Sequence, residues 1–115
     1  MTCVRTLLLA KVVLMTAAAA AAATFEVTAY SIEGKTALGT RARQGIVAAD
    51  PAVLPLGSRI RILGAGAYAG IYTVEDTGRS IQGNRLDIYV AKGSEAKRFG
   101  RRRLAIEILE RREQR

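Results

Sequence analysis

The chain has 115 residues, of which 18 are lysine or arginine, 10 are aspartate or glutamate, and none is histidine. The absence of histidine excludes Ser-His-Asp and Cys-His catalytic arrangements and zinc sites of the histidine–cysteine kind. The net charge of +8 favours an anionic polymer as a partner, such as cell wall, envelope lipid or nucleic acid.

Residues 1–23 have the composition of a secretory signal peptide. Arg5 and Lys11 are basic, residues 12–23 are uncharged and mostly apolar, and the stretch ends in Ala21-Ala22-Ala23, the small-residue pattern of a signal peptidase site. An uncleaved anchor is the alternative, but the apolar stretch is shorter than the roughly 20 residues that a membrane-spanning helix needs. We therefore expect an exported protein, in the periplasm, the cell wall or the extracellular space, with no stable membrane span after cleavage.

The predicted mature chain, residues 24–115, has the length of a single small domain. It holds 16 basic and 10 acidic residues, a net charge of +6, and no cysteine, because the only cysteine is Cys3. Export and the small number of aromatic side chains argue against nucleic acid as the partner. Neither an Asp-x-Asp-x-Asp-Gly calcium loop nor a nucleotide-binding glycine motif occurs, so we expect no metal and no other cofactor.

Six short stretches have the alternating or continuously apolar pattern of β-strands. In chain order they are Phe25–Tyr30, Ile46–Ala49, Ser58–Leu63, Gly70–Val74, Leu86–Ala91 and Leu104–Leu109. A short helix is expected over Ser94–Phe99, with Ser94 as its N-cap and Gly100 as its stop. Six strands, glycine-rich turns and one short helix predict a small β-barrel or a β-sandwich.

Basic side chains are concentrated in two places outside these strands. The longest irregular segment, Gly34–Gly45, carries Lys35, Arg41 and Arg43. We interpret it as the rim of a binding groove, with a solvated loop as the alternative. The second group comprises Lys97, Arg98, Arg101, Arg102 and Arg103, which we interpret as a solvated basic face in contact with an anionic polymer.

The three aspartates, the only ones in the chain, occupy distinctive settings. Asp50 opens the run Asp-Pro-Ala-Val-Leu-Pro-Leu-Gly, Asp76 opens Asp-Thr-Gly, and Asp87 lies inside an apolar strand. Without histidine, acid–base chemistry near neutral pH depends on carboxylates. Asp-Thr-Gly also suits a simple turn. An aspartate in an apolar strand is costly unless it is paired or functional, so Asp87 is the candidate acid, with structural hydrogen bonding as the alternative.

The order and spacing of these motifs resemble those of the 3D domain family, which is named for three aspartates. The family includes MltA-type lytic transglycosylases and small exported cell-wall proteins. The resemblance covers about residues 26–109 and rests on five motifs, which are Thr28-Ala29-Tyr30, Val47–Pro51 with Leu54–Gly57, Asp76–Gly83, Arg85-Leu86-Asp87 and Phe99-Gly100-Arg101.

This resemblance implies a six-stranded double-psi β-barrel and a partner made of peptidoglycan glycan strands. It implies that Asp87 is the single catalytic acid, that Asp76 supports it, and that Asp50 is structural. It further implies substrate contacts from Thr28, Tyr30, Thr77, Gly78 and Arg85. Arg79-Ser80 departs from the small residues usual after Asp-Thr-Gly, and these 115 residues contain no counterpart of the larger enzymes' second domain.

The implied reaction cleaves the bond between N-acetylmuramic acid and N-acetylglucosamine without water. One carboxylic acid protonates the glycosidic oxygen, and its carboxylate then takes the proton of the sugar's 6-hydroxyl, which closes a 1,6-anhydro ring. A hydrolase usually needs two carboxylates. Burial and the neighbouring charge of Asp76 are expected to raise the pKa of Asp87, as this role requires.

Two other functions are compatible with parts of the pattern. Asp76-Thr77-Gly78 is also the signature of aspartic proteases, but Glu75 precedes it where those enzymes have an apolar residue, and the Asp87 motif is then unexplained. A non-catalytic, expansin-like module that binds wall polysaccharide is the more serious alternative, because the chain is basic.

Overall fold

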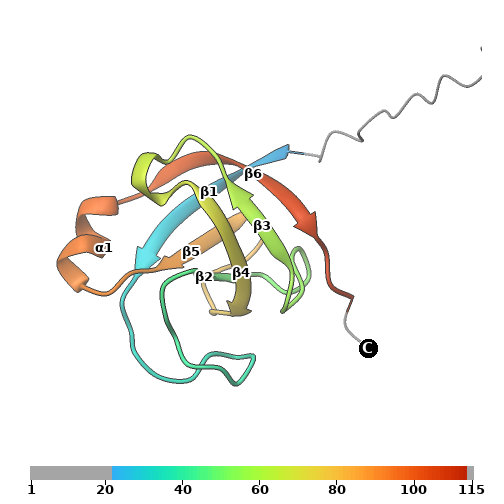
Figure 1. Cartoon of the computed structure of the whole chain (residues 1–115), viewed down its shortest axis with the longest axis horizontal. Coiled ribbons are helices and arrows are strands. Elements are labelled where there is room, and N and C mark those ends of the chain that lie inside the picture. Colours follow the sequence, from blue (N-terminus) through green and yellow to red (C-terminus); the bar gives the residue numbers. More distant parts are fainter. Residues whose placement is uncertain (1–21, 114–115) are drawn as a thin grey trace, which may run out of the picture.

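Six strands form a closed barrel (Figure 1). The computed structural model describes residues 22–113. The strands are β1 Ala22–Tyr30, β2 Ile46–Ala49, β3 Arg59–Ile62, β4 Gly70–Asp76, β5 Arg85–Tyr89 and β6 Arg102–Glu110. They follow one another around the barrel in the order β1-β5-β2-β4-β3-β6. All six predicted strands are confirmed. Because the strands close on one another, the fold is the β-barrel and not the β-sandwich that the sequence also allowed.

Two of the six strand pairs are parallel, and the other four are antiparallel. β1 runs parallel to β5, and β2 runs parallel to β4, whereas β6 closes the barrel antiparallel to both β1 and β3. Apart from β3 and β4, strands that are neighbours in the barrel are not consecutive in sequence, as expected for the double-psi barrel that the family resemblance implied.

Alternate side chains of the strands fill the barrel. Phe25 and Val27 of β1, Leu86 and Ile88 of β5, and Ile106 of β6 belong to one core cluster and are at most 2% exposed. Successive strand residues point to opposite faces. Thr28 and Asp87, which lie between core residues, therefore point out of the barrel.

The helix differs from its prediction at its first residue. α1 spans Gly93–Phe99, and its N-cap is Lys92, which makes no side-chain capping bond. The Lys92 carbonyl accepts the N–H groups of Glu95 and Ala96, so Ser94 lies inside the first turn and the predicted Ser94 cap is wrong. The predicted stop at Gly100 is confirmed, because Gly100 has a φ of 66°, which favours glycine. A short 3₁₀ helix, η2, covers Gly66–Tyr68.

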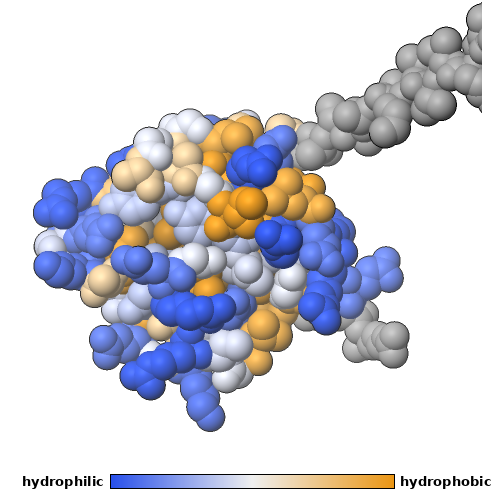
Figure 2. All heavy atoms as spheres, in the orientation of Figure 1, coloured by the Kyte–Doolittle hydropathy of each residue, from blue (hydrophilic) through white to orange (hydrophobic). Residues whose placement is uncertain are grey.

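The predicted solvated basic face is only partly correct. Lys97 and Arg98 are exposed, and Figure 2 shows hydrophilic side chains gathered over α1. The Arg102 guanidinium instead lies 4.2 Å from the centroid of the Phe99 ring, and its Nε donates to the Phe99 carbonyl. Arg102 therefore packs the helix end against the barrel, because its planar cation stacks on an aromatic ring.

Most of the predicted signal peptide, residues 1–23, lies outside the described residues. Ala22 and Ala23 are described and form the start of β1, where they pair with Glu107 and Ile106 of β6. Cleavage after Ala23 and a domain over residues 24–115 stay predictions. Between residues 22 and 113, no helix is both long and apolar enough to cross a membrane.

The barrel core predicts that Ile60→Ala lowers the free energy of unfolding strongly. Ile60 of β3 is fully buried in the core cluster, so its truncation leaves a cavity and should lower the free energy of unfolding by about 2–5 kcal/mol. Ile71 of β4 is 46% exposed, and Ile71→Ala should change it by about 0.5 kcal/mol or less. Urea denaturation measures both values. Equal losses in the two variants would contradict the assigned core.

Candidate functional site

Four residues form a row on the outer face of the barrel, one on each of four neighbouring strands. Thr28 of β1 pairs with Asp87 of β5, Asp87 pairs with Ala48 of β2, and Ala48 pairs with Asp76 of β4. Adjacent strands lie about 4.8 Å apart, which puts the Cα atoms of the two aspartates at roughly 10 Å. The two carboxylates therefore flank Ala48 on one surface, although eleven positions separate them in sequence.

A β-bulge brings Asp76 into this row. Val47 of β2 pairs with Val74 of β4, but the next residue, Ala48, pairs with Asp76, so Glu75 is an extra residue on β4. A bulge of this kind changes the direction of a side chain at the interrupted position. Asp76 consequently lines the outer pocket, while Glu75 is buried beside it with 4% exposure.

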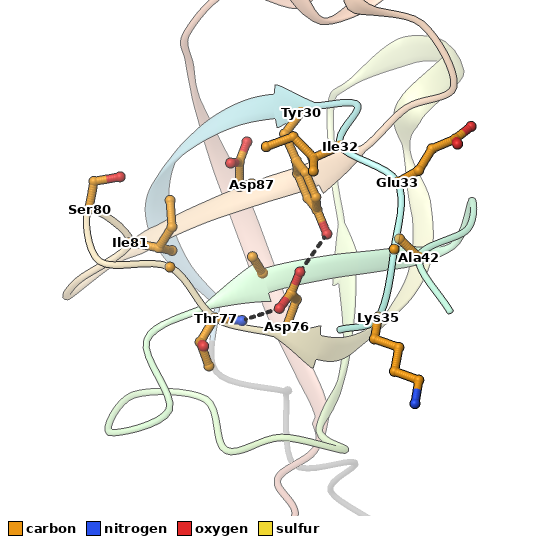
Figure 3. A pocket seen from close by; sticks show the side chains of 13 residues that line it. Tyr30, Ile32, Glu33, Lys35, Ala42, Asp76, Thr77, Ser80, Ile81 and Asp87 are labelled. Atoms are coloured by element: carbon orange, nitrogen blue, oxygen red, sulfur yellow. Dashed lines mark hydrogen bonds between the residues drawn. The ribbon is translucent and has the colours of Figure 1, made fainter. Parts of the chain in front are cut away.

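Both aspartates line a pocket of about 220 Å³ (Figure 3). One wall comes from the end of β1 and the segment that follows it, and the other from the turn after β4. The principal lining residues are Tyr30, Ile32 and Lys35 on the first wall and Thr77, Gly78 and Ile81 on the second. Gly34, Lys35 and Ala42 place the irregular segment Gly34–Gly45 at the rim, as the sequence predicted, while its binding role stays a prediction.

Asp87 occupies the partly buried end of the row. The Thr28 hydroxyl donates to Asp87 Oδ1 over 2.9 Å. Burial raises the pKa of Asp87 above its ordinary value, and the charge of Asp76 adds to this shift, whereas the Thr28 bond and the charge of Arg85 oppose it. The expected direction is confirmed, and its main cause is desolvation of the carboxylate.

Asp76 is surrounded by hydrogen-bond donors. The Tyr30 hydroxyl donates to Oδ2 over 3.2 Å, and the N–H groups of Ala37 and Thr77 donate to Oδ1 over 3.0 and 2.9 Å. Burial and the charge of Asp76 raise the pKa of Tyr30 well above its ordinary value, so Tyr30 remains a donor. All three contacts place donors against the carboxylate oxygens, which accept them.

The predicted substrate-contact residues separate into two groups. Tyr30, Thr77 and Gly78 line the pocket, and their predicted contacts stay predictions. Thr28 and Arg85 lie outside its lining. The Thr28 hydroxyl is directed to Asp87, and the Arg85 guanidinium pairs with Glu26 over 3.2 Å and donates to the Ser80 carbonyl over 3.0 Å. Both residues therefore support the pocket walls from behind.

Asp50 lies outside the pocket lining and connects two turns. Its Oδ1 accepts the N–H of Ala52 over 2.9 Å, and its Oδ2 accepts the N–H of Gly83 over 2.8 Å. These bonds, that of Gly83 first, lower the pKa of Asp50. The geometry agrees with the predicted structural role. Among residues 22–113, no group of three or more His, Cys, Asp or Glu side chains is arranged to hold a metal ion.

Glu75 is the important residue that the sequence analysis missed. Both of its carboxylate oxygens accept from the Arg43 guanidinium, over 2.8 and 2.7 Å, and the Thr40 hydroxyl also donates to Oε1. The Arg43 bonds lower the pKa of Glu75 against the opposing effect of burial. The Glu75 carbonyl additionally accepts the N–H of Leu38 over 3.0 Å. These bonds of Glu75 to Arg43 and Thr40, termed the Glu75 clamp, hold the irregular segment that forms the outer wall of the pocket. The Ala37 N–H of this segment donates to Asp76.

A local signal for this clamp does exist in the sequence. Glu75 and Asp76 are consecutive carboxylates at the end of a strand, and like charges this close disfavour each other's ionised form. Two adjacent carboxylates at a strand end therefore require two different environments. The sequence did not indicate that Arg43, 32 positions earlier, supplies one of them.

The pKa shifts predict opposite effects for two aspartate-to-asparagine variants. Asp87 has a raised pKa in the folded state, so its ionisation opposes folding, and the stability of Asp87→Asn relative to wild type should increase from about pH 3 to about pH 7. Asp50 has a lowered pKa, so Asp50→Asn should become relatively less stable over the same range. Denaturation across the pH series measures both trends. Trends of the same sign would contradict these environments.

The clamp predicts local loosening in Arg43→Gln. This change leaves Glu75 buried without its cation, so the Ala37 and Leu38 amides should exchange with solvent faster than in wild type. Arg41→Gln removes the same charge from an exposed position in the same segment and is the matched control. Hydrogen exchange followed by NMR gives the rates. Equal rates in both variants would show that Glu75 does not hold the segment.

Two curated relatives from Bacillus subtilis (strain 168) are similar to this chain. The cell wall-binding protein YocH is 34% identical over 95 residues, which are 75% of this chain and 32% of YocH. The putative cell wall shaping protein YabE is 38% identical over 80 residues, 66% of this chain and 19% of YabE. The chain thus spans about a third or less of the length of these relatives.

Solved structures of MltA from E. coli have a similar fold. One crystal structure of MltA superimposes with a TM-score of 0.54 at 20% identity, over 69% of this chain and 28% of that chain. MltA with bound chitohexaose gives a TM-score of 0.55 at 16% identity, over 67% and 28%. At these identities the likeness concerns the fold. The family model of the 3D domain matches residues 45–110, which include all three aspartates, and the chain therefore belongs to the 3D domain family.

Proposed function

We propose that this protein is exported and acts on peptidoglycan as a lytic transglycosylase. It would cleave the bond between N-acetylmuramic acid and N-acetylglucosamine, with Asp87 as the single acid and base. The observation that carries the proposal is the shared pocket of Asp87 and Asp76. In that pocket, burial raises the pKa of the first carboxyl, and hydrogen-bond donors surround the second.

The first step needs a protonated carboxyl. The raised pKa of Asp87 increases the fraction of carboxylic acid near neutral pH, and the pocket gives its proton access to a glycosidic oxygen. As that bond breaks, positive charge develops on the sugar. The fixed carboxylate of Asp76 is oriented beforehand by its three donors, so it stabilises this charge without reorganising.

The second step returns the proton to the same residue. The Asp87 carboxylate formed in the first step accepts the proton of the sugar's 6-hydroxyl, and the resulting oxygen closes the 1,6-anhydro ring. Asp87 thereby regains its starting form without water. The Thr28 hydroxyl, 2.9 Å from Oδ1, fixes the orientation of the carboxyl in both steps.

The names of similar proteins support a wall polymer as the ligand. YocH is a cell wall-binding protein, YabE is a putative cell wall shaping protein, and one MltA structure contains chitohexaose. The net charge of +6 over residues 24–115 suits an anionic wall. These features also suit a second candidate function, non-catalytic binding of wall polysaccharide. The name of YocH favours it, as does the limited part of MltA, 28%, to which the barrel corresponds.

Asp87→Asn tests the proposed reaction. The amide keeps the size of the side chain and can still accept the Thr28 bond, but it cannot cycle a proton. Turnover of purified peptidoglycan should therefore fall by about 10²–10⁴-fold while sedimentation with insoluble peptidoglycan persists. Mass spectrometry should identify the wild-type products as 1,6-anhydromuropeptides, lighter by one water than hydrolysis products. Asp50→Asn, which changes a carboxylate outside the pocket, is the matched control and should retain turnover while it is folded.

The outcomes separate the candidate functions. Reducing-end products would identify a hydrolase in place of a lytic transglycosylase. Sedimentation with the wall but no product from folded wild-type protein would favour the binding module. Full turnover by Asp87→Asn would remove the mechanism.

A further inference from the structure

A second pocket, of about 250 Å³, is lined by residues of the irregular segment, η2, β4, β5 and α1. Tyr30 lines the aspartate pocket and Tyr89 lines the second one. Their strands pair at these two residues, and their ring centroids lie 5.7 Å apart in an edge-to-face arrangement. Tyr89 follows Asp87 by two positions on β5, so both side chains lie on the same face of the strand, with Cα atoms roughly 7 Å apart. The Tyr30–Tyr89 contact therefore joins a lining residue of one pocket to a lining residue of the other.

Hydrogen bonds fix the aromatic wall of this second pocket. The Tyr68 hydroxyl donates to Glu95 Oε2 over 2.8 Å, and the Tyr72 hydroxyl donates to the Tyr68 carbonyl over 2.7 Å. The Tyr68 ring also packs edge to face on Phe99, with centroids 5.0 Å apart. Rings held in this way lose little conformational entropy when a ligand binds. None of these contacts takes part in the mechanism proposed for Asp87.

The lining combines flat apolar surface with polar groups for a neutral ligand. Tyr68, Tyr72 and Tyr89 supply aromatic surface, Glu95 supplies carboxylate oxygens, and the exposed Gln44 supplies an amide. A wholly apolar ligand would desolvate the Glu95 carboxylate without compensation. A cation would approach the Arg102 guanidinium, which lies 5.8 Å from the Tyr68 ring centroid. A sugar ring fits both constraints, because it has apolar C–H faces and hydroxyl groups and carries no charge.

We propose that the second pocket is a saccharide subsite, which holds one sugar of the glycan strand whose neighbouring sugars occupy the aspartate pocket. The inference rests on the proposed function in so far as both pockets take the same strand. The Tyr30–Tyr89 pair is then the point at which the strand passes from one pocket to the other. Longer oligosaccharides therefore bind more tightly than short ones, and the additional affinity depends on residues that lie away from the aspartates.

The test is an NMR titration with N-acetylglucosamine oligomers, from the monosaccharide to chitohexaose. In wild type, chitohexaose should shift the amide signals of Gly45, Ala67 and Val90, and the monosaccharide should bind far more weakly. Tyr89→Ala should weaken chitohexaose binding by about tenfold, since an aromatic contact contributes on the order of 1 kcal/mol beyond its area, and should weaken binding of the monosaccharide less.

Further variants keep the test decisive if Tyr89→Ala does not fold. Gln44→Ala changes an exposed side chain, and Glu95→Gln removes the lining charge while it preserves an acceptor for Tyr68. Gln44→Ala should weaken chitohexaose binding selectively, and Glu95→Gln should do so less. Arg41→Gln, in the same irregular segment but outside both linings, is the matched control and should bind all oligomers as wild type does.

The outcomes distinguish failure of the subsite from failure of the proposed function. Binding of oligomers that is independent of length and insensitive to Tyr89 and Gln44 would overturn the subsite and leave the proposed function standing. No binding of any oligomer or of peptidoglycan would overturn both. Signal shifts at Gly45 and Val90 with tetramethylammonium but not with chitohexaose would overturn the saccharide assignment in favour of a cation site.

Discussion

The register of β2 between β4 and β5 determines where the two pocket carboxylates lie. Ala48 pairs with Asp87 on one side and with Asp76 on the other. A slip of one residue in β5 would turn Asp87 into the barrel and expose Leu86 and Ile88, which are at most 1% exposed. The apolar core therefore holds the outer row of Thr28, Asp87, Ala48 and Asp76 in place. Each core residue points into the barrel and so fixes the outward direction of its neighbour in sequence.

The bulge on β4 assigns consecutive carboxylates to different tasks. Glu75 is held by Arg43 and fixes the segment that forms the outer wall of the pocket, whereas Asp76 accepts an N–H from that same wall at Ala37. The irregular segment and the Asp76 carboxylate thus position each other. No residue of the irregular segment Gly34–Gly45 belongs to the apolar core cluster, so this ion pair and the neighbouring threonine bonds hold the segment in place of a core.

Three aspartates of identical chemistry have different surroundings in this fold. Two backbone N–H groups bind Asp50 and lower its pKa, whereas burial raises the pKa of Asp87. Asp76 lies between the Tyr30 hydroxyl and two N–H groups. The same pocket thus presents one partly buried carboxyl that accepts from a threonine hydroxyl and one carboxylate that accepts from three donors. Tyr30 of this pocket packs on Tyr89 of the second pocket, with ring centroids 5.7 Å apart.

The sequence by itself determined the strands, the helix stop at Gly100 and the family, because alternation, glycine and motif order are local properties of the chain. It also identified Asp76 and Asp87 as a pair, through the resemblance and the cost of an aspartate in an apolar strand. It did not reveal the Glu75–Arg43 clamp, the stacking of Arg102 on Phe99, or the positions of Thr28 and Arg85 behind the pocket. Most of these depend on contacts between residues far apart in sequence. Arg102 and Phe99 are close in sequence, but their stacking depends on how β6 leaves the end of α1. Only the tertiary structure determined these contacts. Strand pairing and closure of the barrel select the partner of each charged side chain, and no local pattern in the sequence encodes them.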